Sequence, residues 1–204
     1  MTENAQRSGT HFRLRPFISG SLAKKLSISG SLVRMAGSLL IEYKVRGWLE
    51  GIKWPSNSSV ACRRHRLWRH TCFEFFCGIQ GETGYWEVNL CPSGCWNVYR
   101  FDGYRSGMRE EGAVGPPTCR VAAARDLLSL ACTVNFNGII EDSSTLELGL
   151  GSVIEATDGS TGYWAIDHPG AEPDFHDRRG FVLVLPGVGN ADIHGENDEE
   201  SARY

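Results

Sequence analysis

Short apolar segments separated by turn residues constrain the fold of this chain more than any other feature. Residues 11–17 (HFRLRPF) alternate in polarity, and residues 38–47 (SLLIEYKVRG) are apolar and β-branched. Pro-Ser-Gly, Asp-Gly, Pro-Pro, Asn-Gly and His-Pro-Gly separate such segments, as turns between strands do. Further strands are predicted at 71–77, 85–90, 96–101, 119–124, 128–136, 145–156, 163–167 and 181–185. About nine or ten short strands predict an all-β fold, an antiparallel, jelly-roll-like β-sandwich.

The chain is long enough for one domain that buries its own core. It has 204 residues, so disulfide staples are not needed for stability. Residues 1–9 are polar, and we expect them to be disordered. Residues 187–204 carry five acidic side chains against one arginine, which predicts a flexible acidic tail. The folded domain is therefore expected over 10–186, with a helical turn allowed at 21–28 and at 124–131.

The overall charge gives no reason to expect a nucleic-acid or membrane partner. The formal net charge is −3, and the local basic run RRHRLWRH at 63–70 is interpreted as a solvated loop rather than a phosphate site. The first thirty residues lack the apolar centre of a signal peptide. No apolar run approaches the roughly 20 residues of a membrane span. We therefore expect a cytoplasmic location.

The cysteines argue against a disulfide framework. There are seven, an odd number, in a chain without an export signal. No CxxC pair occurs, so buried free thiols that pack as small apolar side chains are expected. A hairpin would bring Cys91 and Cys95 within bridging distance, and their redox state is left open.

Residues 84–107 (GYWEVNLCPSGCWNVYRFDGYRSG) predict a hairpin with two different faces. A three-residue turn at 92–94 places Cys91 opposite Cys95 and Glu87 opposite Tyr99. Because side chains alternate along a strand, one face is apolar and belongs to the core: Trp86, Val88, Leu90, Trp96, Val98 and Arg100. The other face mixes rings with polar groups: Tyr85, Glu87, Asn89, Asn97, Tyr99 and Phe101.

This polar face suits a ligand rich in hydroxyl groups. Aromatic rings can receive a flat apolar surface, while amides and carboxylates bind hydroxyls. Glu74 should point to the side of Glu87, because burying a carboxylate unpaired is costly. The candidate ligand-binding residues are Trp68, Glu74, Tyr85, Glu87, Asn89, Asn97, Tyr99, Arg105 and Trp164. The alternative is purely structural, since such cross-strand pairs stabilise sheets by about 0.2–1 kcal/mol each.

Three stretches of the sequence resemble the DOMON-like family. They are LWRHTCFEFF, GYWEVNLCPSGCWNVYRFDGYRSGM and YWAIDHPGAEPDFHDRRGFVLVL, which occur in this order over about 67–185. The resemblance implies a β-sandwich akin to family 9 carbohydrate-binding modules and the cytochrome domain of cellobiose dehydrogenase. It also implies a ligand that is either a sugar or haem. Cys91 and Cys95 depart from the family pattern, in which polar residues are usual at these positions.

A b-type haem is the alternative that this resemblance raises. Met108 and His168 are the candidate axial ligands, because the wider group uses Met and His. His168 follows a predicted strand and precedes Pro169, where it serves equally well as a hydrogen-bonded strut. No CxxCH motif is present for covalent attachment. His176 lies between two aspartates, so we assign it a surface or loop-tethering role, and no metal site is expected.

The sequence contains no catalytic motif. GxSxG, a P-loop, GxGxxG and HExxH are all missing. We therefore expect a non-catalytic module that binds a carbohydrate-like small molecule without a cofactor. The alternatives are a b-type haem redox module and a domain for protein interaction or regulation.

Overall fold

The computed structural model describes residues 9–56 and 61–189 of the chain. The first strands and helices are β1 (Thr10–Pro16), α1 (Ser21–Lys25), β2 (Leu26–Met35), β3 (Ser38–Gly47), η1 (Leu49–Gly51), β4 (Cys62–Arg63) and η2 (Leu67–Arg69). The central ones are β5 (Cys72–Ile79), β6 (Tyr85–Leu90), β7 (Cys95–Phe101), β8 (Arg109–Glu110) and β9 (Thr118–Ala123). The last are β10 (Leu127–Asn135), β11 (Leu146–Glu155), β12 (Thr161–Ala165), η3 (Arg178–Gly180) and β13 (Leu183–Leu185).

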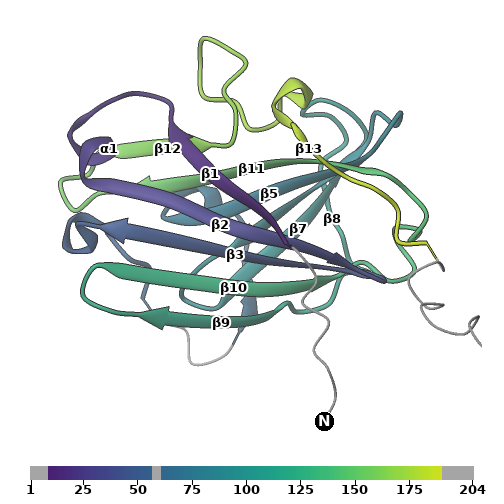
Figure 1. The fold of residues 1–204 in the computed structure, drawn as a ribbon, viewed down its shortest axis with the longest axis horizontal. Coiled ribbons are helices and arrows are strands. Elements are labelled where there is room, and N and C mark those ends of the chain that lie inside the picture. Colours follow the sequence, from purple (N-terminus) through teal and green to yellow (C-terminus); the bar gives the residue numbers. More distant parts are fainter. Residues whose placement is uncertain (1–8, 57–60, 190–204) are drawn as a thin grey trace, which may run out of the picture.

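The strands form one curled, mixed sheet. Their order is β4-β7-β6-β5-β11-β12-β1-β2-β3-β10-β9, with β13 beside β11 and β8 beside β7. In Figure 1 strands β1, β2, β3, β10 and β9 follow one another from top to bottom. Strand β4 pairs with β7 in parallel, and the other strand pairs are antiparallel. The predicted all-β fold is confirmed, and ten of the thirteen strands in the described residues have five or more residues.

The principal core lies between the two halves of this sheet. It joins buried side chains of β2, β3 and β10 to those of β5, β6, β7 and β11. Strand β3 alternates between buried and half-exposed residues, so one of its faces lies toward this core. Strands β5, β6 and β7 instead bury nearly every residue. These three strands must therefore be covered on their outer face as well.

The hairpin of β6 and β7 has the predicted register. Glu87 lies opposite Tyr99, Asn89 opposite Asn97 and Leu90 opposite Trp96. The backbone N–H of Cys91 donates to the carbonyl of Cys95, which closes the turn. The predicted core face is correct as well, since Trp86, Val88, Leu90, Trp96 and Val98 all belong to the principal core.

Strand β2 is absent from the strands that the sequence predicts. The helical turn allowed at 21–28 is confirmed as α1, but it ends at Lys25, and Leu26 begins a ten-residue strand. Gly30 in this strand obscures the pattern, yet the fold requires it. A Cβ at Gly30 would lie 1.8 Å from the carbonyl oxygen of Glu42 on β3. The helical turn allowed at 124–131, in contrast, is wrong, because β10 begins at Leu127 and pairs with β3 and β9.

Two cysteines form a disulfide, so the expectation of seven free thiols is wrong. Cys119 on β9 and Cys132 on β10 are direct cross-strand neighbours, and their sulfur atoms are bonded. Spacing in the sequence did not reveal the pair because the register of β9 against β10 was unknown. Cys72, Cys77, Cys91 and Cys95 are buried free thiols.

The chain ends lie largely outside the described residues. The predicted disordered segment 1–9 is described only at Gly9, and the predicted acidic tail 187–204 only as far as residue 189. Val188 donates a backbone hydrogen bond to the carbonyl of Asp142 (2.7 Å), so the tail begins against the sheet domain. In the described part of the chain no helix has the length and apolar character needed to cross a membrane.

Candidate functional site

A cavity of about 310 Å³ lies on the outer face of β5, β6 and β7. Its floor is made by Glu74 and Phe76 of β5, Glu87 of β6 and Phe101 of β7. These four residues belong to the polar face of the predicted hairpin and to the matching face of β5. The alternation of side chains along each strand is therefore what brings them together.

Loops and a short helix form the walls of the cavity. Trp68 comes from η2, Arg105 and Met108 from the loop after β7, and Tyr163 from β12. The remaining wall comes from the segment after β12, with Pro173, Phe175 and His176. The walls are thus largely aromatic, while the floor carries two carboxyl groups.

The two floor carboxyls are buried close to each other. Glu74 lies opposite Asn89 and Phe76 opposite Glu87, so the two acids are diagonal neighbours on adjacent strands. Each side chain is about 3% exposed. Burial raises the pKa of Glu87 to about 7. The hydrogen bond of 2.6 Å that Glu87 accepts from Nδ2 of Asn89 lowers this pKa, but by less than burial raises it. Burial and the neighbouring Glu87 hold the pKa of Glu74 well above its usual value.

Glu74 also has an unused hydrogen-bonding atom. Its Oε1 has no hydrogen-bond partner among residues 9–56 and 61–189. A buried polar group without a partner costs roughly 1–3 kcal/mol, so such groups are uncommon in folded proteins. An orphaned oxygen on a cavity-lining residue marks a place where a ligand can supply the missing hydrogen bond.

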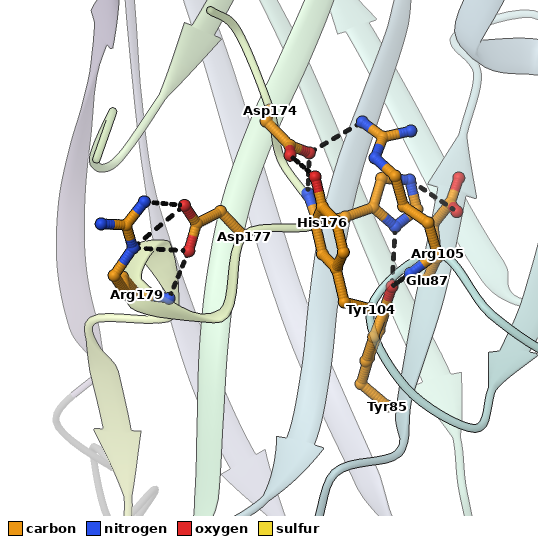
Figure 2. Close-up of polar contacts among 8 residues, drawn as sticks. All are labelled: Tyr85, Glu87, Tyr104, Arg105, Asp174, His176, Asp177 and Arg179. Atoms are coloured by element: carbon orange, nitrogen blue, oxygen red, sulfur yellow. Dashed lines mark hydrogen bonds and ion pairs between the residues drawn. The ribbon is translucent and has the colours of Figure 1, made fainter. Parts of the chain in front are cut away.

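His176 connects the floor to the wall. Its Nδ1 lies 2.9 Å from the hydroxyl of Tyr85, and its Nε2 lies 3.8 Å from Oε2 of Glu87. Figure 2 shows this imidazole between the two side chains. Burial, together with the charge of Arg105, lowers the pKa of His176 to about 4. The imidazole is therefore neutral near pH 7. Of the two roles expected from the sequence, the hydrogen bond to Tyr85 fits loop tethering, whereas a surface position does not fit a side chain that is 15% exposed.

Arg105 and Asp174 join the two wall loops. Nη2 of Arg105 donates to Oδ1 of Asp174 at 2.7 Å, and the hydroxyl of Tyr104 donates to Oδ2 of the same carboxylate. The backbone N–H of Arg105 donates to the hydroxyl of Tyr85. Asp177 pairs with Arg179 instead. No group of three metal-ligating side chains is found in the described residues.

Glycines in β11 make room for the wall. A Cβ at Gly151 would lie 2.9 Å from the ring of Phe175, and one at Gly149 would lie 2.8 Å from the ring of Phe181. Both glycines point to the outer face because they are two residues apart on one strand. The wall segment can therefore pack its rings directly onto the sheet.

Asn97 and Tyr99 belong to a polar cluster that does not line the cavity. Nδ2 of Asn97 donates to the hydroxyl of Tyr99 and to Oε1 of Glu110. The Tyr99 hydroxyl also meets Nδ1 of His65 at 2.8 Å, and Arg63 donates to Oδ1 of Asn97. The structural explanation thus fits these residues, because their hydrogen bonds tie the chain before η2 to β7. Asn89 likewise acts through its bond to Glu87.

Among the predicted site residues, Trp68, Glu74, Glu87 and Arg105 line the cavity, and Tyr85 lies directly behind it. Trp164 does not, because it faces the principal core while its neighbour Tyr163 faces the outer cavity. Alternation along 163–167 is the sequence signal that could have identified Tyr163, rather than Trp164, as the ring on the outer face. Phe175 and His176 had no such signal, since they lie outside the strands.

The residues suggested for haem are not brought together. Met108 lines the cavity, but His168 does not. Nε2 of His168 lies 2.8 Å from the carbonyl of Arg15, and its ring packs edge-on against Phe17. His168 is therefore a strut between the segment after β12 and β1, and the pair does not fit axial ligation of one iron in this cavity.

Comparisons with known proteins point to a fold shared with carbohydrate-binding proteins. No protein-family model and no curated protein matches the sequence. The structure resembles a candidate carbohydrate-binding protein from Bacteroides uniformis, with a TM-score of 0.63, 13% identity and coverage of 84% of each chain. It also resembles a family 9 carbohydrate-binding module from Caldicellulosiruptor kristjanssonii in complex with glucose, with a TM-score of 0.53, 9% identity and coverage of 98% of this chain and 93% of that chain. At such low identity, what the chain shares with these two proteins is its β fold.

Proposed function

We propose that this chain is a non-catalytic module that binds a carbohydrate-like small molecule in the outer cavity. The observation that carries the proposal is the pairing of two buried floor carboxyls with aromatic walls in one cavity. The fold supports it, because a structure of similar fold is a module in complex with glucose. The finer classification as a jelly-roll-like sandwich of the DOMON-like family is part of the same proposal.

The chemistry of the cavity matches a sugar ring. Sugars present hydroxyl groups at their edges and apolar C–H groups on their faces. Glu74 and Glu87 offer carboxyl oxygens to the hydroxyls, while Trp68, Tyr163 and Phe175 offer rings to the faces. The volume, about 310 Å³, is near the lower end of the roughly 300–1,000 Å³ of small-molecule pockets. One or two sugar units are therefore the expected occupant.

Replacing Trp68 with alanine should weaken sugar binding about tenfold, since a well-placed ring contributes up to about 1.5 kcal/mol beyond its buried area and about 1.4 kcal/mol corresponds to tenfold. The measurement is calorimetric titration of the whole chain with a panel of mono- and disaccharides. Trp48→Ala is the matched control, because Trp48 is 45% exposed and stacks on Lys25 rather than lining the cavity. Equal losses in the two variants would contradict the assignment of Trp68 to the site.

The alternatives from other classes have their own readouts. A haem protein would keep a Soret band after incubation with haemin and removal of the unbound haemin, and a protein that is colourless after this step excludes that alternative. A chain that binds no member of a broad glycan panel would not be a sugar-binding module. The interaction or regulatory domain would then take its place.

The cytoplasmic location is also a proposal, and the cysteines test it. Disulfides are rare in the cytoplasm, where thiols are kept reduced. Protein made in an oxidising compartment should titrate two more thiols after unfolding with reductant than without it, because Cys119 and Cys132 are bonded. Protein quenched directly from its native cells should titrate the same number with and without reductant if the location is the cytoplasm. Two additional thiols on reduction of that sample would contradict the location.

A further inference from the structure

The floor acids of the cavity have no cation of their own. Glu87 accepts a hydrogen bond from Asn89, and the imidazole beside it, His176, is neutral near pH 7. Glu74 has an oxygen without a partner in the described structure. Arg105 also lines the cavity, but its guanidinium is already paired with Asp174 at 2.7 Å. Two carboxyls therefore face the cavity without a basic side chain committed to either of them.

The other groups packed around these acids do not supply a positive charge. Cys72, which precedes Glu74 by two residues on β5, is fully buried and donates to Oδ1 of Asn89. Tyr43 reaches from β3 to the backbone carbonyl of Glu74 (2.7 Å). Tyr85 is committed to His176 and to the backbone of Arg105. Arg105, which is paired with Asp174, is therefore the charged neighbour that acts on the acids, and its charge lowers the pKa of Glu87 against the larger effect of burial.

The rings of the cavity add a second feature that favours a cation. Trp68, Phe101, Tyr163 and Phe175 all line it. The face of an aromatic ring attracts a cation within about 6 Å of the ring centre, and the attraction grows when water is excluded. Carboxyl oxygens on the floor and ring faces in the walls therefore offer a cation two independent kinds of attractive contact. A neutral sugar would use the rings only for packing.

We propose that the natural ligand of this cavity carries a protonated amine, as an amino sugar does, and that the ammonium group binds between Glu74 and Glu87. An ammonium has three N–H donors and no acceptor, whereas ionised carboxylates only accept. The pairing gives the free oxygen of Glu74 a donor and gives one ionised carboxylate a counter-charge, while the other carboxyl keeps its proton. This inference rests on the proposed function for the sugar part of the ligand.

Binding of an ammonium must release protons. Burial raises the pKa of Glu87 to about 7, so without a ligand this carboxyl is about half protonated at pH 7, and the pKa of Glu74 is also held well above its usual value. An adjacent positive charge favours the ionised carboxylate. The ligand keeps its proton, the carboxyl loses one to the buffer, and the charges balance as an ion pair. A neutral sugar has no such effect on the two acids.

The test is a calorimetric titration of the full chain at pH 7 with matched pairs of ligands. The pairs are glucosamine with glucose, galactosamine with galactose and mannosamine with mannose. N-acetylglucosamine, whose nitrogen carries no charge, is the control for glucosamine. In at least one pair the amino sugar should bind about tenfold more tightly or better, as a charged hydrogen bond allows. Titrations in two buffers of different ionisation enthalpy should show proton release with the amino sugar and none with its neutral partner.

Glu74→Gln should abolish the preference for the amino sugar, and the exposed Glu82→Gln should keep it. If Glu74→Gln does not fold, Glu87→Gln takes its place in the test. The measurement of proton release uses the natural chain and needs no variant. Neutral sugars that bind as tightly as amino sugars in every pair would overturn the inference and leave the proposed function standing. If cyclohexylamine binds and none of the sugars does, the result would support amine recognition and overturn the sugar function. Failure of every ligand would overturn both.

Discussion

Replacing Glu87 with glutamine should stabilise the protein by about 3 kcal/mol at pH 7 and above, relative to the natural chain, and by nothing near pH 4. The folded-state pKa of Glu87 is about 7, raised from 4.5 by burial. Between these two values the unfolded chain has released its proton and the folded chain has not, so rising pH favours unfolding by about 1.4 kcal/mol for each pH unit. Glutamine has no proton to lose, and its amide oxygen can still accept from Asn89.

The measurement is chemical denaturation of both chains from pH 4 to pH 8, with the difference in the free energy of unfolding plotted against pH. The difference isolates Glu87 from His176, whose effect runs the other way. The pKa of His176 is lowered to about 4, so it makes the protein more stable as pH rises from 4 to about 6.5. Glu82→Gln is the control, and its difference from the natural chain should not change with pH. If the difference in the free energy of unfolding for Glu87→Gln is equally independent of pH, the result would contradict a buried Glu87 carboxyl with a raised pKa.

Replacing Gly151 with valine should weaken ligand binding about thirtyfold while leaving the sheet folded. A Cβ at this position would lie 2.9–3.1 Å from three ring atoms of Phe175. The ring must move, and it lines the cavity. A ring that no longer packs on the ligand loses about 2 kcal/mol of apolar burial, which corresponds to the expected change in affinity. Valine suits a strand better than glycine, so the strand itself gains stability.

The affinity of the tightest-binding sugar and the denaturation midpoint should be measured together. Gly115→Val is the matched control, because no atom lies within 4 Å of a Cβ at Gly115. Loss of binding with an unchanged midpoint in Gly151→Val supports the role of Phe175 as a wall of the site. Unchanged binding would show that Phe175 has no part in it, and unfolding in both variants would point to the loss of a glycine rather than to the ring.

Much of the floor of the site was predictable because it is built on strands. Glu87 on β6 and Glu74 on β5 share a face for the reason stated from the sequence: residues alternate with a period of two, and a buried carboxyl seeks the polar side. The three-residue turn then set the register of the hairpin. The same reasoning, applied to residues 163–167, would have chosen Tyr163 instead of Trp164.

The walls of the site were not predictable in this way. Arg105 and Asp174 are 69 residues apart, and no periodicity relates two loops. Their meeting depends on how the segment after β12 crosses the outer face, which in turn needs the small glycines of β11. His176 was expected to have a surface or loop-tethering role because its neighbours are aspartates. Those carboxylates bind Arg105 and Arg179, and the imidazole lies largely covered, with a hydrogen bond to Tyr85 that tethers the loop.

The sequence by itself determined the all-β class, the register of the β6–β7 hairpin and the division of its side chains into an apolar and a polar face. These features follow from local alternation and turn length, which act over a few residues. Only the tertiary structure decided that the polar face is the floor of a cavity, that Asn97 and Tyr99 tie down the chain before η2, and that His176 is neutral. Burial and charge at these positions depend on residues far away in the chain, and the sheet must curl before they meet.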